Sequence, residues 1–210
     1  MAWTYEQLFN TLTDGDLNGQ DSWSGDTGLD VVTSTPTPYE GAKTLKGITP
    51  ADFNDHEVTR SITSLSDGIV YFSYLFSNSG GSDKRLSIKL LSGATIVVYL
   101  KCFGTTILLE NRTPGNDTVA TGLVADTWYR IGLEYNATND QARANVDGGT
   151  FSAWSDVYLA TSVDTMKIVA SDNNGASGGY IGCDAISPNY TPVAGATARS
   201  TPTLLTLAVG

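Results

Sequence analysis

The sequence predicts an all-β protein, built as a two-sheet antiparallel β-sandwich. Short segments with alternating apolar and polar residues, or with many β-branched and aromatic residues, follow one another along most of the chain. Polar turns separate these segments. In addition, no stretch of a dozen residues keeps its apolar residues at helical spacing.

On the order of a dozen segments have the composition of strands, which is typical of a sandwich or barrel. The clearest are 56–63, 68–76, 85–91 and 94–101, and the turns between them are rich in Ser, Gly, Asn and Asp, so we expect consecutive antiparallel hairpins. The other segments are 29–33, 42–46, 105–110, 128–135, 141–146, 166–170 and 180–186. Residues 4–12 fit either a short helix or a first strand.

The chain has 210 residues, enough to bury the core of one domain without help from a metal or a disulfide. Charged residues make up 16% of it, against about 25% in an average protein. We expect the sandwich to occupy 1–190. Residues 191–210 contain no acidic residue and one base, Arg199, which predicts an extended arm that docks on a partner or on copies of the chain. The alternative is that the segment packs back as an edge strand of its own sandwich, with Pro192 and Pro202 at the turns.

The net charge of −10 opposes binding to nucleic acids or anionic membranes, which both depend on clustered Lys and Arg. No run of 18 apolar residues predicts a membrane span. The first residues lack the basic and apolar regions of a Sec signal, so we expect synthesis without one. Cys102 and Cys183 stand 81 positions apart with no second Cys nearby, and both are expected to be buried free thiols.

Several motifs resemble one known superfamily. They are the opening stretch 9–23 (FNTLTDGDLNGQDSW), the stretches 127–135 (TWYRIGLEY) and 141–149 (QARANVDGG), and the closing stretch 179–186 (GYIGCDAI). These resemble the concanavalin A-like lectin and glucanase superfamily, in the laminin G-like jelly-roll form found in phage and uncultured microbial structural proteins. The resemblance covers most of residues 9–190 and implies a jelly-roll sandwich.

The resemblance also implies a place for a structural calcium ion, between the entry strand and the closing strand. Asn10 stands where the superfamily often has an acid, and Asp184 stands near the position of the second ligand. Calcium takes six to eight oxygens with several charges, so an Asn in this place is a poor substitute. Asp184 could equally cap a turn, and no other cofactor is expected.

The catalytic patterns of the superfamily's enzymes are missing. The retaining glucanases carry E-x-D-x-x-E on one strand, and none of the five glutamates here has an Asp two residues later. The lyases need a Q-x-H strand, whereas His56, the only histidine, has no Gln two residues before it. We therefore expect a protein that is not an enzyme.

Aromatic rings could instead form a sugar-binding surface, since sugars stack on Trp and Tyr. The candidates are Trp23, Trp128, Trp154, Tyr39, Tyr71, Tyr158 and Tyr180. Trp154 is the best of them because it lies beside a Gly-Gly turn, and Trp23 and Tyr158 complete the predicted carbohydrate-binding set. Trp128 lies within a strand and is expected in the core.

These observations leave three hypotheses about function. The first is a non-catalytic structural or adhesive module, a phage-type virion surface or capsid-decoration protein that binds a capsid or other virion protein. The second is a lectin-like module that binds a glycan. The third is a polysaccharide-active hydrolase or lyase without a recognisable catalytic motif.

Overall fold

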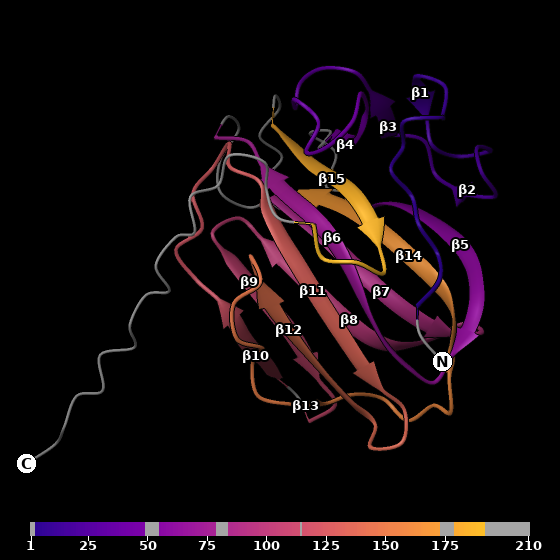
Figure 1. Cartoon of the computed structure of the whole chain (residues 1–210), viewed down its shortest axis with the longest axis vertical. Helices are drawn as coiled ribbons and strands as arrows, with labels where there is room; N and C mark the ends of the chain where they lie inside the picture. The colour runs from indigo at the N-terminus through magenta and orange to yellow at the C-terminus, as the bar shows by residue number, and fades with distance from the viewer. Residues whose placement is uncertain (1–2, 49–54, 79–83, 114, 173–178, 192–210) are drawn as a thin grey trace, which may run out of the picture.

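The structure is a computed structural model, and it describes residues 3–48, 55–78, 84–113, 115–172 and 179–191. These residues form two antiparallel sheets that lie face to face (Figure 1). The prediction of an all-β sandwich is confirmed, and no helix occurs among the described residues. In particular, no described helix is long and apolar enough to cross a membrane.

The first sheet has eight strands. In spatial order they are β1 (Gly15–Asp16), β3 (Leu29–Val32), β4 (Thr44–Ile48), β15 (Tyr180–Ser187), β6 (Asp67–Phe76), β11 (Tyr129–Asn136), β12 (Gln141–Val146) and β13 (Ser155–Asp156). The closing strand β15 thus lies in the middle of the sheet, between β4 and β6, far in sequence from both.

The second sheet has seven strands. In spatial order they are β10 (Gly115–Ala120), β9 (Thr106–Asn111), β8 (Thr95–Phe103), β7 (Lys84–Ser92), β14 (Val163–Asp172), β5 (His56–Leu65) and β2 (Ser24–Gly25). Of the hairpins expected between consecutive segments, β7–β8 is present, and β8 also pairs with β9. The hairpins expected between 56–63 and 68–76 and between 68–76 and 85–91 do not form, because β6 lies in the eight-stranded sheet whereas β5 and β7 lie in the seven-stranded sheet.

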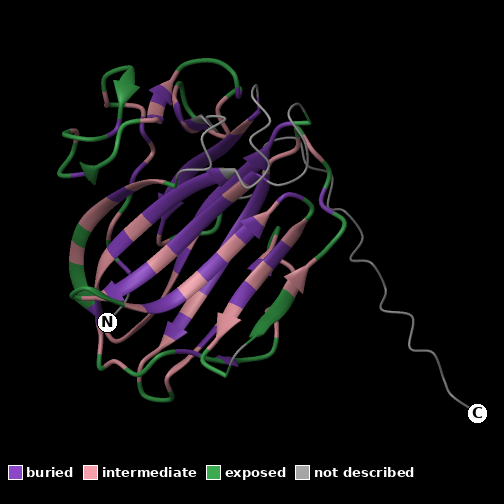
Figure 2. Cartoon of the chain, turned by 180° about the vertical axis from the view of Figure 1, so that it is seen from behind, coloured by how far each residue is buried: buried purple, intermediate pink, exposed green. Residues whose placement is uncertain are grey.

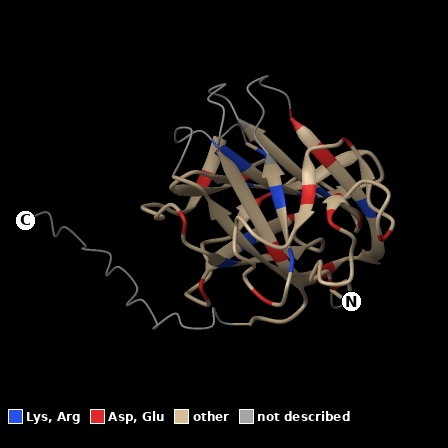
Figure 3. Cartoon of the chain, turned by 90° about the horizontal axis from the view of Figure 1, so that it is seen from above, with Lys and Arg blue, Asp and Glu red and all other residues tan. Residues whose placement is uncertain are grey.

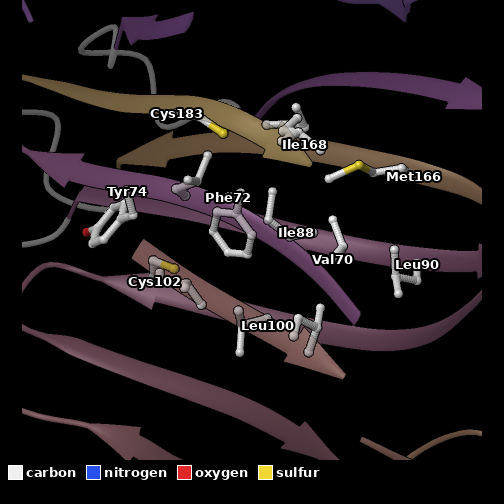
Figure 4. Packing of buried hydrophobic residues seen from close by; sticks show 14 of the residues in the cluster. Val70, Phe72, Tyr74, Ile88, Leu90, Leu100, Cys102, Met166, Ile168 and Cys183 are labelled. Carbon is white, nitrogen blue, oxygen red and sulfur yellow. The ribbon is translucent and has the colours of Figure 1, made fainter. Parts of the chain in front are cut away.

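Side chains that alternate along the strands fill the space between the sheets. Figure 2 shows this alternation as bands of buried and half-buried residues along several strands. Figure 4 shows the centre of the core, where Val70 and Phe72 from one sheet lie near Ile88 and Leu100 from the other. Cys102 and Cys183 are both buried free thiols, as predicted.

Residues 4–12, for which helix and strand were both open, form neither. Their one contact of strand type is a single antiparallel bridge between Gln7 and Ile186. Two residues further on, Phe9 has a φ of 59°, which lies in the left-handed region, so the backbone does not continue as an extended strand. The predicted arm, 191–210, lies outside the described residues except for Thr191, whose carbonyl oxygen accepts a hydrogen bond from the Tyr39 hydroxyl at 2.6 Å.

Candidate functional site

The candidate site lies on the outer face of the eight-stranded sheet, over β6, β11 and β12. On β11 the side chains of Tyr129, Ile131 and Leu133 belong to the core. Because successive side chains of a strand point to opposite faces, Arg130 and Glu134 point outward. The same alternation turns Tyr71 and Ser73 of β6 outward, together with Arg143 and Asn145 of β12.

One half of this outer face is covered by chain, and Arg130 is the anchor of the covering segment. Its guanidinium donates hydrogen bonds to the carbonyl oxygen of Ala185 and, at 3.0 Å, to that of Asn189. It also donates to the hydroxyls of Ser73 and Ser187, at 3.2 and 2.7 Å. Arg130 is fully buried, and this burial lowers the pKa of its guanidinium. The segment 185–190 is thereby tied to the sheet.

A second segment, 36–43, covers the neighbouring part of the face, and Asp184 holds it. One carboxylate oxygen, Oδ2, accepts hydrogen bonds from the backbone N–H groups of Tyr39 and Glu40, at 2.9 and 3.3 Å. The other, Oδ1, accepts from the N–H of Ala185 at 2.7 Å. Burial raises the pKa of Asp184 to about 7, although the backbone hydrogen bonds lower it.

Asn10 holds the far end of the same segment. Its Oδ1 accepts hydrogen bonds from the backbone N–H groups of Ala42 and Lys43, at 2.6 and 3.0 Å. The two residues predicted as calcium ligands, Asn10 and Asp184, therefore both use their oxygens to bind backbone N–H groups of segment 36–43. Among the described residues no group of three or more His, Cys, Asp or Glu is placed to hold a metal ion.

The other half of the outer face is open, and Arg143 lies at its centre in contact with three other side chains. Glu134 lies opposite Arg143 in the β11–β12 register, and the Arg143 Nε donates to the Glu134 Oε2 at 2.6 Å. The Arg143 guanidinium also lies 4.2 Å from the centre of the Trp154 ring and 4.9 Å from that of Phe151. These contacts fix Arg143 between a carboxylate and two rings.

Two residues before Glu134 on β11, the outward position is a glycine, Gly132. Gly132 pairs with Asn145 on one side and with Tyr71 on the other. A Cβ atom on Gly132 would lie 2.5 Å from the Asn145 Oδ1 and 2.7 Å from the Tyr71 Cε1, so both neighbours lean over the glycine. Asn145 is fixed there, because its Oδ1 accepts from the N–H of Gly132 and its Nδ2 donates to the Gly149 carbonyl.

Tyr190 forms the border between the covered and the open halves. Its ring lies 5.7 Å from that of Tyr71 in an edge-to-face arrangement and remains 37% exposed. We use the name open face for six residues: Tyr71, Glu134, Arg143, Phe151, Trp154 and Tyr190. Asn145, which lies beside them, is buried, with 6% of its surface exposed. The ion pair of Glu134 and Arg143 thus lies between two aromatic pairs, Phe151 with Trp154 and Tyr71 with Tyr190.

The predicted carbohydrate-binding residues have three different positions. Trp154 belongs to the open face and is 37% exposed. Tyr158 is exposed too, but it lies beyond β13, where its backbone N–H donates to the Val97 carbonyl of β8 on the other sheet. Trp23 requires a correction: its ring is 1% exposed within the core and so offers no surface for stacking.

The structure places one tryptophan differently from the prediction and reveals outward-facing polar residues that were not predicted. Trp128 was expected in the core, but it lies on the outer face and packs on Gly182 beneath segment 36–43, with its indole N–H bonded to the Thr37 carbonyl. Glu134, Arg143 and Asn145 were not named as site residues. Their alternating positions on two predicted strands indicate that they point outward. This alternation does not predict which half of the sheet's outer face is left uncovered by other segments of the chain.

Comparisons with known proteins support the fold. No protein-family model matches this sequence, and no curated protein sequence is significantly similar to it. Among solved structures, a sialidase superposes with a TM-score of 0.66 at 12% identity over 90% of this chain, which spans 18% of the sialidase. Lectin II from Ulex europaeus superposes with a TM-score of 0.56 at 10% identity, covering 88% of this chain and 97% of the lectin.

An alginate lyase from Corynebacterium sp. superposes with a TM-score of 0.54 at 10% identity, covering 86% of this chain and 91% of the lyase. The chain therefore has the jelly-roll, concanavalin A-like sandwich fold that its motifs indicate. Lectins and glycan-active enzymes both share this fold, so the fold alone does not choose between them.

Proposed function

We propose that this protein is a lectin-like module that binds a carbohydrate on its open face. The observation that carries the proposal is the partly exposed ion pair of Glu134 and Arg143 between two aromatic pairs. Sugar rings present apolar C–H faces that stack on aromatic rings, and equatorial hydroxyls that exchange hydrogen bonds with carboxylate, guanidinium and amide groups.

The polar groups of the open face are held in place before any ligand binds. Arg143 is fixed by Glu134 and by two rings, and Glu134 is fixed in turn by Arg143. Ordering a free side chain at an interface costs about 0.5–1.5 kcal/mol. Because these side chains are already ordered, most of that cost is absent when a sugar binds.

We further propose that binding is not followed by cleavage. Glycoside hydrolysis normally uses two carboxyl groups on either side of the scissile bond. The open face holds one carboxylate, Glu134, and Arg143 is already paired with it at 2.6 Å. His56, the sole histidine, lies on β5 in the other sheet.

A glycan array followed by calorimetry tests the proposal. We expect a defined set of glycans to bind, and we expect Trp154→Ala to weaken binding by roughly fivefold or more, since an aromatic contact contributes about 1 kcal/mol. Tyr158→Ala is the matched control, because it removes an exposed ring outside the open face and should leave affinity unchanged. Equal losses in the two variants, or no binding at all, would refute the assignment, and release of reducing ends from a bound glycan would show that the module is an enzyme.

The hypothesis of a virion surface or capsid-decoration protein remains a prediction from sequence. It rests on the superfamily resemblance and on the arm at 191–210, of which only Thr191 is described. Truncation after Thr191 keeps the hydrogen bond from Tyr39. We expect the shortened chain to melt at the same temperature but to lose association with particles or with copies of itself, and a chain that unfolds on truncation would contradict this role.

A further inference from the structure

The outer face of the seven-stranded sheet carries a concentration of positive charge. On the three central strands β14, β7 and β8, the core takes alternate residues such as Ile168, Ile88 and Leu100. The outward residues between them are Thr165, Lys167 and Val169 on β14, Arg85, Ser87, Lys89 and Leu91 on β7, and Tyr99, Lys101 and Phe103 on β8. This set, which we call the basic face, contains four cations and no acid.

That distribution is unusual for this chain, which has 22 acidic and 12 basic residues. Acidic residues are otherwise spread over loops and strands all round the molecule (Figure 3). Acids adjoin the basic face in three places. Glu57 of β5 pairs with Lys167 and Glu110 of β9 pairs with Lys101, each at 2.6 Å, and the carboxylate of Asp164 near the start of β14 accepts a hydrogen bond from the Thr165 hydroxyl at 3.0 Å. The four cations outnumber these three carboxylates, so the surface keeps a net positive charge.

The register brings like charges together within the basic face. Lys167 and Lys89 stand directly opposite one another in the β14–β7 pairing, and Lys89 stands opposite Tyr99 of β8. Like charges in directly opposite positions destabilise a sheet. Lys89 has no acidic partner within 4.0 Å among the described residues, and its ammonium lies 4.6 Å from the centre of the Tyr99 ring.

Tyr99 is shared by two ammonium groups. Lys101 lies 4.4 Å from the same ring centre, two residues along β8. Three lysines thus converge on neighbouring positions of three adjacent strands, about 4.8 Å apart across the sheet. An anion that spans these positions would relieve the repulsion, which solvent and the adjoining carboxylates relieve only in part.

We propose that the basic face is a second binding site, which takes a polysaccharide that carries carboxylate or sulfate groups. A sugar polymer with one or two charges per residue matches a row of lysines next to the half-buried hydroxyl of Thr165. A nucleic acid fits less well, because duplex DNA has one negative charge per roughly 1.7 Å of axis and would meet strong repulsion from a chain of net charge −10. This site is on the opposite sheet from the open face and does not depend on it.

Binding of polygalacturonate, which carries carboxylates, and of dextran sulfate tests the proposal, with neutral dextran and a duplex DNA oligonucleotide for comparison. Calorimetry at about 50 and 200 mM salt should show binding of at least one of the two anionic polysaccharides that weakens as salt rises. It should show no binding of dextran and weaker binding of the oligonucleotide.

Lys89→Gln/Lys167→Gln should weaken that binding roughly tenfold, as expected for two lost surface charge contacts. Lys46→Gln/Arg112→Gln makes the same change in net charge away from the basic face and should bind as the parent does. Lys89→Gln alone breaks no ion pair, so it serves where the double variant fails to fold. Trp154→Ala should retain this binding, which separates the basic face from the open face.

Three results would overturn the proposal. They are no binding of either anionic polysaccharide, an equal loss in the basic-face and control variants, and an oligonucleotide that binds as tightly as the polysaccharides. The last result would show a general affinity for polyanions.

Discussion

The buried carboxyl group of Asp184 predicts that the protein loses stability as the pH rises from acidic to alkaline values. Burial raises its pKa from an ordinary value near 3.8 to about 7 in the folded chain. Between these two values the unfolded chain has already released the proton, while the folded chain still holds it. The stabilising contribution is therefore complete below about pH 3.8 and is lost as the pH rises through about 7.

The size of the effect follows from the same two pKa values. Each pKa unit corresponds to about 1.36 kcal/mol, so linkage over the interval from pH 5 to pH 8.5 removes roughly 3 kcal/mol of unfolding free energy. For a chain of this size, 1 kcal/mol shifts the melting temperature by roughly 2–4 °C. We expect the melting temperature to fall by roughly 6–12 °C over that interval.

Thermal denaturation of three chains isolates the contribution of Asp184. Asp184→Asn removes the titrating group and should flatten the dependence on pH between 5 and 8.5. Asp156→Asn changes the net charge equally at an exposed position and should keep the slope of the parent. A carbon-13 titration of the Asp184 carboxyl in the parent chain measures the folded pKa directly and does not depend on the folding of any variant.

The reasoning is refuted if the parent chain is equally stable or more stable at pH 8.5 than at pH 5. It is refuted as well if Asp184→Asn and Asp156→Asn have the same slope, since the dependence would then arise from overall charge repulsion. A measured carboxyl pKa near 4 would show that the three backbone hydrogen bonds outweigh burial.

Three further predictions concern stability. Gly132→Ala should lower the unfolding free energy by about 1–3 kcal/mol in denaturant titration, because its methyl group would collide with Asn145 and Tyr71; an unchanged midpoint would contradict the described packing. Asn10→Ala should cost about 1–3 kcal/mol by the same measurement, because it leaves two backbone N–H groups of segment 36–43 without their acceptor. Chelation with EDTA should leave the melting temperature unchanged, and a fall of tens of degrees would reveal a structural ion.

Much of the fold could be predicted because strand periodicity is a local property of the sequence. Segments such as 68–76 and 141–146 alternate clearly, and both are strands with the same bounds to within a residue. Strand β10 was missed because its sequence, GNDTVA, has almost no apolar residues and its side chains are mostly exposed. The two-residue strands β1, β2 and β13 are too short to show any period.

The candidate site was harder to predict because it depends on which segments cover the sheet. Trp154 was recognised beside its Gly-Gly turn, whereas Trp23 and Trp128 were misplaced in opposite directions. Local sequence places Trp23 in a polar loop and Trp128 on a strand. The structure buries Trp23 in the core and places Trp128 on the outer face under segment 36–43. Such burial is set by contacts between residues far apart in sequence, which composition and periodicity do not report.

Contacts between residues far apart in sequence also explain why Arg130, an outward-facing residue, is fully buried. On sequence alone it is one more polar residue at a solvent-facing position of β11. Its guanidinium instead binds the carbonyl oxygens of Ala185 and Asn189, next to Tyr190 at the border of the open face. The residues that fix segments 36–43 and 185–190 therefore also fix where the open face ends.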